Sequence, residues 1–480
     1  MSESTRQRLA TLLLALDPAD TADGTEAQLR GRVARLLTSA EPDRVWLSMA
    51  VMQAALPTRD RVLETRRRIR LSGADAVLAS LGRRVARSGF GRPRQVRVLS
   101  DTVIVDVSHT ARTGLATGIQ RVARNVLRGW TAAHEVTLVG WSQDRTALRA
   151  LSGPEQQNAV HGTAPHAERG AHDVIIVPWR STYLLPELAI ESERTSRLAA
   201  LAEFSGNRTG ALGFDCVPIT SAETTGSGMG GAFAKNLAAL ARFDRIAAIS
   251  AAAATEYRGW RRMLSGAGIA GPGIEDIMLP ADAGVVDDAA VARARAELVT
   301  DGLPLLLCVG SHEPRKNHLA VLNAAERLWR EGREFCLAFV GGNSWGSRQF
   351  TMELEQLQAR GRPVKAISAI SDDLLWSGYL LARATVFPSL NEGFGLPVTE
   401  SLAMGTPVVT SDFGSMREIA AGGGAVLVDP RNDADVARGV AEAMFDDERN
   451  AELRAEAAAR VDRTWPEYAD AAWEYLCAST

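Results

Sequence analysis

The chain has 480 residues, of which 46% are hydrophobic and 23% charged, and its formal net charge is −3. This is more residues than one hydrophobic core usually contains, so we expect two or three domains. The composition is that of an ordinary globular protein. A net charge so close to zero argues against a nucleic-acid partner, because it gives no global positive field. Four widely spaced cysteines without a C-x-x-C pair indicate a reduced, cytoplasmic chain. No apolar run approaches the ~20 residues that span a bilayer.

Residues 1–95 are expected to form a helical extension. Apolar residues repeat at helical spacing in 9–16 and again in 46–52. The first of these runs leads into a segment with three aspartates, so we interpret it as a helix stripe and not as a secretion signal. Glycines and a proline at 89–93 then interrupt the helical pattern.

A basic segment spans residues 59–97, where twelve arginines stand against three acidic residues. Two interpretations stay open. The segment is either a solvated helical face that also packs on the next domain, or a peripheral contact with an anionic membrane surface. In the second case each arginine near the surface contributes about 1 kcal/mol, and the chain would lie at the inner face of the membrane.

From residue 96 onward, short apolar runs alternate with helical stretches, which predicts parallel, doubly wound sheets. The first set of elements, in residues 96–285, has expected strands at 103–107, 136–139, 174–177 and 245–250. Helices are expected from about residue 117, after residue 139, near residue 191 and after residue 250. A Gly/Pro-rich stretch at 266–273 and a helix at 287–298 separate this set from the next.

The second set, in residues 286–463, has expected strands at 303–309, 335–340, 364–367, 384–387, 407–410 and 425–428. A last helix at 468–476, within residues 464–480, is expected to pack back on the first domain. Two α/β domains side by side form a cleft at the carboxyl ends of both sheets, where ligands usually bind.

The strongest motif is N-E-G-F-G-L-P-V-T-E at residues 391–400, directly after an expected strand. Its glycines leave room for a ligand against the backbone, and the free N–H groups of the helix that starts near Pro397 attract an anion such as a phosphate. Glu400, in the first turn, is suited to accept hydrogen bonds from vicinal sugar hydroxyls. The alternative is a tight strand–helix turn in which Glu400 only balances the helix dipole.

A second motif, G-S-H-E-P-R-K-N-H, occupies residues 310–318 after another expected strand. Arg315 and Lys316 are adjacent cations at a helix start, where they oppose the macrodipole unless an anion lies between them and the helix. The chain has only three lysines, so this one departs from the general use of arginine. A diphosphate is the expected anion, and a solvated basic turn is the alternative.

A third motif joins D-V-S-H-T at 106–110 to T-G-I-Q-R-V at 117–122. A strand, a loop with glycines and a helix form the geometry with which a first βα turn approaches a phosphate. His109 and Arg112 lie on this loop and are candidates for contact with an acceptor. An ordinary turn glycine at Gly118 and a loop histidine with a structural partner are the alternatives.

These motifs resemble those of glycosyltransferase family 4. The two glutamates with seven residues between them are followed by A-M-G-T-P-V-V at 403–409 and G-S-M-R-E at 414–418, as in that family's signature. The second motif resembles the E-P-R-K-N variant of mannosyltransferase-like members. The resemblance covers roughly residues 100–480 and implies the GT-B fold. Two Rossmann-like domains would face each other, the first on the acceptor side and the second on the donor side.

The resemblance also implies roles for individual residues. Glu400 matches the glutamate that binds the nucleotide ribose, and Glu392 matches the one that lies against the donor sugar. Arg315 and Lys316 match the diphosphate site, although Ser311 stands where many members have an arginine. The implied donor-binding residues are Gly118, Asp215, Arg315, Lys316, Glu392, Gly393, Phe394, Gly395, Leu396 and Glu400.

Asp215 is the residue of this set with the weakest match. Relatives often have a His-Asp pair here that faces the donor sugar, but Phe214 stands in place of the histidine. Only the aspartate can therefore be carried over, and a buried aspartate at a strand end is the alternative.

The resemblance implies a metal-independent, retaining hexosyltransferase that uses a nucleotide diphosphate sugar. A mannose-like sugar is the first expectation and rhamnose the second, with a glycan, lipid-linked or small-molecule acceptor. Arg315, Lys316 and Glu392 are the expected catalytic residues, and the leaving phosphate oxygen would take the acceptor proton.

No cofactor and no metal are expected. The D-x-D sequence at 433–435 precedes a helix, so we interpret it as an N-cap region and not as a metal site. Two other functions stay open. One is a different GT-B nucleotide-sugar enzyme, such as an epimerase, and the other is a catalytically silent GT-B scaffold subunit.

Overall fold

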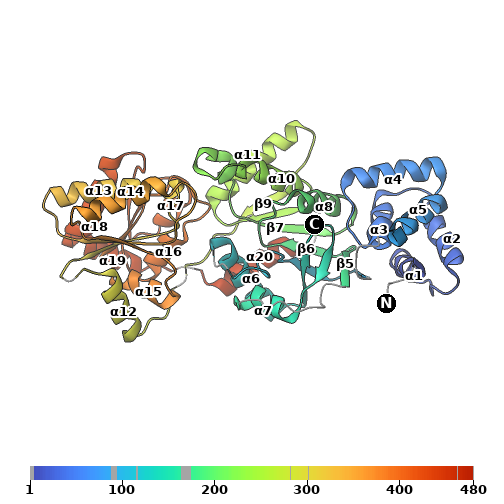
Figure 1. Ribbon diagram of the computed structural model, residues 1–480, viewed down its shortest axis with the longest axis horizontal. Coiled ribbons are helices and arrows are strands. Elements are labelled where there is room, and N and C mark those ends of the chain that lie inside the picture. Colours follow the sequence, from blue (N-terminus) through green and yellow to red (C-terminus); the bar gives the residue numbers. More distant parts are fainter. Residues whose placement is uncertain are drawn as a thin grey trace.

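The computed structural model describes residues 5–87, 94–114, 117–163, 174–281, 283–300, 302–461 and 463–478. These residues form three parts in a row: a helical region, a middle α/β domain and a second α/β domain (Figure 1). The expected pair of α/β domains with an additional N-terminal helical region is confirmed. Within these described ranges no helix is both long and apolar enough to cross a membrane.

The helical region buries its apolar stripe. Leu9, Leu12 and Leu13 of the expected N-terminal stripe are all buried in its core. The break in the helical pattern that was expected at 89–93 lies outside the described residues. The helices are α1 (Thr5–Leu16), α2 (Glu26–Leu36), α3 (Pro42–Gln53), α4 (Arg59–Ser72) and α5 (Ala74–Arg87).

The middle domain contains a nine-stranded sheet with the order β1-β5-β4-β3-β2-β6-β7-β8-β9. Its strands are β1 (Gln95–Leu99), β2 (Val103–Asp106), β3 (Val136–Trp141), β4 (Leu148–Ala150), β5 (Val174–Pro178), β6 (Thr182–Leu185), β7 (Arg208–Gly213), β8 (Arg245–Ala248) and β9 (Gly273–Asp276). Its helices are α6 (Gly118–Ala133), α7 (Gly153–His161), α8 (Ser192–Phe204), α9 (Val217–Thr220), α10 (Met229–Leu240) and α11 (Ala251–Gly266), with a 3-10 turn, η2 (Ala222–Thr224).

The sheet of the middle domain is parallel, as expected, except at one strand. Strand β4 runs antiparallel to both β3 and β5. The backbone of Ser142 bonds to that of Ala147, and the Ser142 hydroxyl accepts a hydrogen bond from the Ala147 N–H, so the chain turns back at once. A direct return of this kind can only produce an antiparallel neighbour. Strand β4 itself is only three residues long and has Arg149 at its centre, so its sequence contains no apolar run that would predict it.

The C-terminal domain contains a six-stranded, fully parallel sheet with the order β12-β11-β10-β13-β14-β15. Its strands are β10 (Leu305–Val309), β11 (Cys336–Val340), β12 (Val364–Ile367), β13 (Ala384–Phe387), β14 (Val408–Ser411) and β15 (Ala425–Val428). The chain reverses its direction of strand addition between β10 and β13. In a doubly wound sheet the crevice at this reversal is the usual ligand position.

Helices cover both faces of this sheet (Figure 1). They are α12 (Asp288–Leu298), η3 (Pro314–Lys316), α13 (His318–Arg330), α14 (Arg348–Ala359), α15 (Asp372–Leu381), α16 (Leu396–Ala403), α17 (Gly414–Ala420), α18 (Asp433–Phe445) and α19 (Asp447–Ala458). At the D-x-D sequence, the Asn432 side chain accepts hydrogen bonds from the backbone of Ala434 and Asp435 and caps α18. This sequence therefore belongs to a helix start, as expected.

The last helix, α20 (Trp465–Cys477), leaves the C-terminal domain and packs on α6 of the middle domain. The indole N–H of Trp130 donates a 2.9 Å hydrogen bond to the carbonyl of Ala469. Trp473 stacks on His134, with 3.8 Å between the ring centroids. In Figure 1 this red helix lies among the green and cyan elements. The chain therefore crosses twice between the two α/β domains.

The helical region is attached to the middle domain through α3 and α4, which contact α8. The Leu56 N–H donates to the carbonyl of Thr146 over 2.9 Å, and Arg59 forms a 2.7 Å ion pair with Glu203. Within α4, Arg66 donates to a backbone carbonyl of the same region. Part of the basic segment is thus used for packing inside the protein.

Candidate active site

Two loops of the C-terminal domain meet at the point where strand addition reverses. One loop follows β10 and carries Arg315 and Lys316, and the other follows β13 and carries Glu392. The Leu390 N–H donates to the Arg315 carbonyl over 2.9 Å, and the Arg315 guanidinium donates to the Asn391 carbonyl over 2.8 Å. The first and second sequence motifs therefore form one site.

Glu392 lies between the two cations. One carboxylate oxygen is 2.5 Å from Nη1 of Arg315, and the other is 2.6 Å from Nζ of Lys316. The Ser389 hydroxyl donates to the carboxylate over 2.7 Å. Burial alone would raise the pKa of Glu392, but the charges of Arg315 and Lys316 lower it to about 2. The carboxylate is therefore ionised at any physiological pH.

This ion-pair cluster changes the expectation that the two cations are free for an anion. Arg315 also bonds to Glu313 over 2.7 Å, and burial, which alone would lower its pKa, is outweighed by the charges of Glu392 and Glu313, so the pKa is raised. Two cations thus face two carboxylates. A diphosphate would have to share Arg315 and Lys316 with Glu392, so its binding depends on how the cluster rearranges.

The glycines of the first motif bring the backbone of the two domains into contact. Gly395 has a φ of 116°, which favours glycine, and it precedes the first turn of α16. A Cβ on Gly393 would lie 2.4 Å from the carbonyl oxygen of Phe214 and 2.8 Å from a carboxylate oxygen of Asp215. Any side chain at position 393 would push the middle domain away from this loop.

Asp215, at the end of β7, therefore faces the C-terminal site directly. Burial raises its pKa to about 6, although the charge of Arg315 acts in the opposite direction. One carboxylate oxygen accepts a hydrogen bond from the Val217 N–H over 3.1 Å. The buried-aspartate interpretation and the donor-site interpretation are both compatible with this position.

Glu400 lies one turn into α16 and is only 3% exposed. The Tyr379 hydroxyl of α15 donates a 2.7 Å hydrogen bond to Oε2. Arg121, from α6 of the middle domain, places Nη1 2.6 Å from Oε1. Close by, Gly118 at the start of α6 lies against Leu396, because a Cβ on Gly118 would be 3.5 Å from its side chain. The expected donor residues of both domains thus meet here.

Further contacts hold the two domains together. The Ser250 hydroxyl donates to the Gly393 carbonyl over 2.7 Å. The Glu418 carboxylate accepts from the first backbone N–H groups of α11, at 3.0 Å and 3.2 Å, where a negative charge balances the helix dipole. On the other side of the site, the Asn391 amide donates to the Ser221 hydroxyl over 3.1 Å. The structure is therefore a closed arrangement of the domains.

The loop after β2 carries His109 and Arg112 and is held from within the middle domain. Glu187 accepts hydrogen bonds from the backbone N–H groups of His109 and Thr110 at 2.9 Å. The His109 ring bonds to the Gln120 amide over 3.0 Å. Arg112 donates to the carbonyl of Trp141, and burial together with neighbouring arginines lowers its pKa to about 10. Both side chains have protein partners, and their expected contact with an acceptor stays a prediction.

A buried charge network fixes this loop, and sequence reasoning missed it. Arg194 of α8 is fully buried and bonds to Glu187 over 2.8 Å and to Asp106 over 3.0 Å. Asp106 also accepts hydrogen bonds from Tyr183 over 2.5 Å and from the Trp141 indole over 2.6 Å. The sequence does not show that Arg194 is buried, because its partners lie up to 88 residues away along the chain.

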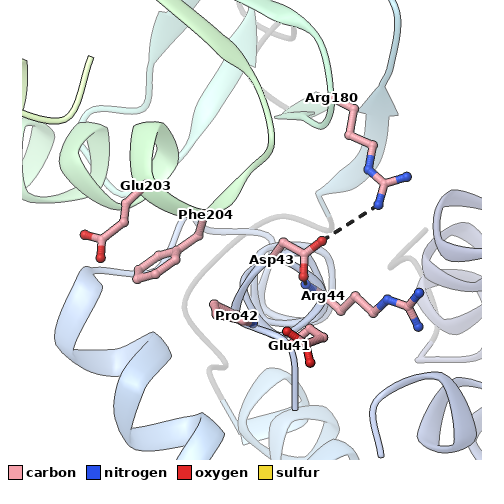
Figure 2. A pocket seen from close by; sticks show the side chains of 7 residues that line it. All are labelled: Glu41, Pro42, Asp43, Arg44, Arg180, Glu203 and Phe204. Carbon is pink, nitrogen blue, oxygen red and sulfur yellow. Dashed lines mark hydrogen bonds and ion pairs between the residues drawn. The ribbon is translucent and has the colours of Figure 1, made fainter. Parts of the chain in front are cut away.

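Within the described residues no group of three His, Cys, Asp or Glu side chains is arranged to hold a metal ion. The pocket in Figure 2 has a volume of about 590 Å³ and lies between the helical region and the middle domain, away from the motifs. Two of its carboxylates already have cationic partners, since Asp43 is 3.8 Å from Arg180 and Glu203 pairs with Arg59. We therefore place the candidate active site between the two α/β domains and not in this pocket.

Comparison with known proteins shows which families the chain is similar to. Residues 292–460 match the family model described as "Glycosyl transferases group 1". A serotype-specific mannosyltransferase, WbdA, of Escherichia coli is 28% identical over 349 residues, which cover 70% of this chain and 41% of that protein. The D-inositol 3-phosphate glycosyltransferase of Thermomonospora curvata is 33% identical over 206 residues, covering 41% of this chain and 47% of that protein. The chain thus spans less than half the length of these relatives.

Solved structures show the same architecture at low sequence identity. Sucrose-phosphate synthase from Thermosynechococcus elongatus has a TM-score of 0.53 at 15% identity, covering 80% of this chain and 96% of that one. HepE of Anabaena, in complex with UDP and glucose, has a TM-score of 0.53 at 14% identity, covering 75% of this chain and 94% of that one. The chain therefore has the GT-B fold, and its match to the group 1 glycosyltransferase model lies in the C-terminal domain.

Proposed function

We propose that the chain is a retaining, metal-independent glycosyltransferase that moves a hexose from a nucleoside diphosphate sugar to a glycan acceptor. The observation that carries this proposal is the cluster of Arg315, Lys316 and Glu392, which lies at the strand reversal of the C-terminal sheet and faces Asp215 of the middle domain. It combines cations, a helix start and a closed interdomain position, which together suit a diphosphate leaving group.

The proposed chemistry follows from the charge that develops during transfer. As the bond between the anomeric carbon and the diphosphate oxygen breaks, negative charge grows on the phosphate. Arg315, Lys316 and the N–H groups at the start of α16 would stabilise it. The acceptor oxygen forms the new bond to the anomeric carbon on the same face, and the leaving phosphate oxygen takes the acceptor proton. Closure of the two domains excludes water and fixes both reactants.

Mannose is the proposed sugar and rhamnose the second choice. The WbdA relatives and an O-antigen chain mannosyltransferase B of Escherichia coli, 35% identical over 130 residues that cover 27% of this chain and 33% of that protein, support mannose and a polysaccharide acceptor. A lipid-linked acceptor would agree with a cytoplasmic chain that contacts the inner face of the membrane through the basic segment 59–97.

The experiment that tests the proposal starts with the donor. Thermal unfolding of the full chain is measured with GDP, UDP and dTDP, and a ligand at ~100 times its dissociation constant should stabilise by roughly 2.7 kcal/mol. The matching nucleotide sugars are then incubated with oligosaccharide acceptors, in buffer with and without EDTA. We expect release of the nucleoside diphosphate only when an acceptor is present, unchanged by EDTA, with the anomeric configuration retained in the product.

Other outcomes separate the alternatives. A change of the donor sugar with no acceptor in the reaction would identify an epimerase. Nucleotide binding without turnover on any donor and acceptor, together with a stable complex with another protein, would identify a silent scaffold subunit. Inverted product or loss of turnover in EDTA would contradict the retaining or the metal-independent part of the proposal.

A further inference from the structure

The interaction of Glu400 with two different domains has a consequence for nucleotide binding. Glu400 is almost completely buried, and its carboxylate lies in the C-terminal domain. Its partner on Oε2, Tyr379, comes from the same domain. Its partner on Oε1, Arg121, comes from α6 of the middle domain, and the Arg121 side chain is 36% exposed. The Glu400 carboxylate is thus oriented by Tyr379 from its own domain and by Arg121 from the other domain.

Both partners keep their donor character. Burial and the charge of Glu400 raise the pKa of Tyr379 well above its usual value, so the hydroxyl stays protonated. Burial alone would lower the pKa of Arg121, but the adjacent Glu400 raises it, so the guanidinium stays charged. Neither partner can take the proton-accepting role, and Glu400 is the acceptor of the cluster.

The carboxylate has hydrogen-bond acceptor positions that the protein does not use. Each carboxylate oxygen has two acceptor positions. Oε2 uses one of them for Tyr379. Oε1 is buried and forms an ion pair with Arg121, but it meets no well-directed hydrogen-bond donor in the described part of the chain. At least one acceptor position on each oxygen is therefore open, which is the pattern that two vicinal hydroxyls require.

We propose that Arg121 and Tyr379 are positioning residues that hold Glu400 for the two ribose hydroxyls of the donor nucleotide. Tyr379 fixes the carboxylate within the C-terminal domain, and Arg121 completes the arrangement only when the domains are closed. This inference rests on the proposed function, which assigns Glu400 to the donor ribose. It adds a residue of the middle domain to the nucleotide site, and it links nucleotide affinity to domain closure.

The test measures nucleotide affinity and not only activity. Isothermal titration of the full chain uses the nucleoside diphosphate that binds best, either GDP or UDP, and its 2′,3′-dideoxy counterpart. We expect Arg121→Met to weaken binding of the ribose form about tenfold, as a lost contact with a charged group does, and to leave binding of the dideoxy form within about twofold. Tyr379→Phe should show the same selectivity, and Arg121→Lys should restore part of the affinity.

A double-mutant cycle shows whether Arg121 acts through Glu400. In the Glu400→Gln background, Arg121→Met should change the affinity by less than about twofold, because the carboxylate that it orients is gone. Arg128→Met is the matched control: this arginine lies on the same helix, is exposed, and donates only to the Val160 carbonyl in the described structure. In steady-state kinetics Arg121→Met should raise KM for the donor and change kcat little.

Three results would overturn the inference. A gain in affinity for the ribose form would show that Arg121 blocks the site and must be displaced. An equal loss for the ribose and dideoxy forms would show a contact with the phosphates or a structural effect. No change in either form would show that Arg121 has no role in binding. If the wild-type chain binds no nucleoside diphosphate at all, the proposed function fails first, and this is distinguishable from the three results above.

Discussion

The two α/β domains use buried charges in different ways. In the C-terminal domain, Arg315, Lys316 and Glu392 lie at the carboxyl end of a parallel sheet and hold one another at a surface that faces the other domain. In the middle domain, Arg194 bonds to Asp106 and Glu187, and Glu187 in turn binds backbone N–H groups of the loop after β2. We propose that the first cluster binds a ligand, whereas the second holds a loop.

This difference shows that burial of a charge does not by itself identify a catalytic group. Loss of a charge from the loop-holding network should cost mainly stability, because buried carboxylates lose their counter-ion. Loss of a charge from the site cluster should cost mainly turnover. Stability and activity measured on the same variants can therefore separate the two clusters.

The largest expected effect on stability is that of Arg194→Met. It leaves Asp106 and Glu187 buried without their cation, so the free energy of unfolding of the middle domain should fall by about 3–5 kcal/mol. Urea unfolding followed by tryptophan fluorescence measures it. Arg197→Met on the same helix, whose partner Glu193 is exposed, should cost less than about 1 kcal/mol. Equal losses for the two variants would refute the distinction between loop-holding and surface charges.

Lys316→Ala should reduce turnover by about two to three powers of ten, the effect of removing one preorganised donor from a developing charge. The unfolding midpoint should change little, because Arg315 stays paired with Glu392. Lys235→Ala, on the exposed surface of α10, is the control and should have wild-type turnover. A rise in the donor KM at unchanged kcat would mean that Lys316 binds the ground state and transition state equally.

Asp215→Asn tests the charge that faces the site from the middle domain. In the folded chain its pKa is raised to about 6, chiefly by burial. Between its ordinary value of 3.8 and about 6, the folded state therefore binds more protons than the unfolded state, so this group's contribution to stability falls as pH rises through that window. The wild type minus Asp215→Asn difference in unfolding free energy should decline on the order of 1 kcal/mol from pH 4 to pH 7. A difference that does not vary with pH would contradict the raised pKa.

The smallest expected effect concerns the basic segment. Arg67 and Arg70 of α4 are exposed and meet no acidic partner among the residues that the structure describes. If the segment contacts a membrane, the full chain should sediment with anionic liposomes at low salt, and Arg67→Glu with Arg70→Glu should weaken this by about 1 kcal/mol or more per residue. Binding should fade toward ~0.5 M salt. A wild-type chain that stays in the supernatant at low salt would leave packing as the role of the segment.

The sequence predicted the C-terminal domain better than the middle domain, for a physical reason. The four inner strands of the parallel sheet, β10, β11, β13 and β14, are buried almost throughout, and the edge strands β12 and β15 are partly exposed. All six have mainly apolar sequences, and each expected strand agrees with the structure within two residues. In the middle domain, β1, β4, β6, β7 and β9 were missed. These strands are short, lie at the sheet edge or carry polar residues, so their sequences lack a continuous apolar run.

The structure brings the motifs of the candidate site together, but their partners could not be predicted from the sequence. Glu392, Arg315 and Lys316 were expected near one ligand, and the structure brings them together. Arg121 lies within the third motif without a predicted role, and Tyr379 lies outside all the motifs. The sequence does not reveal which residue pairs with a charged side chain when the two lie in different domains. Arg121 and Glu400 are 279 positions apart.

The return of α20 to the middle domain also affects the order of folding during synthesis. Residues 277–464, with the whole C-terminal sheet, are inserted between β9 and α20 of that domain. Chains emerge from the ribosome at about 5–20 residues per second, and domains fold as units. The inserted domain is therefore complete before the helix that covers α6 becomes available. Until then Trp130 and its apolar neighbours lack the helix that covers them, so we expect the nascent middle domain to expose apolar surface until synthesis ends.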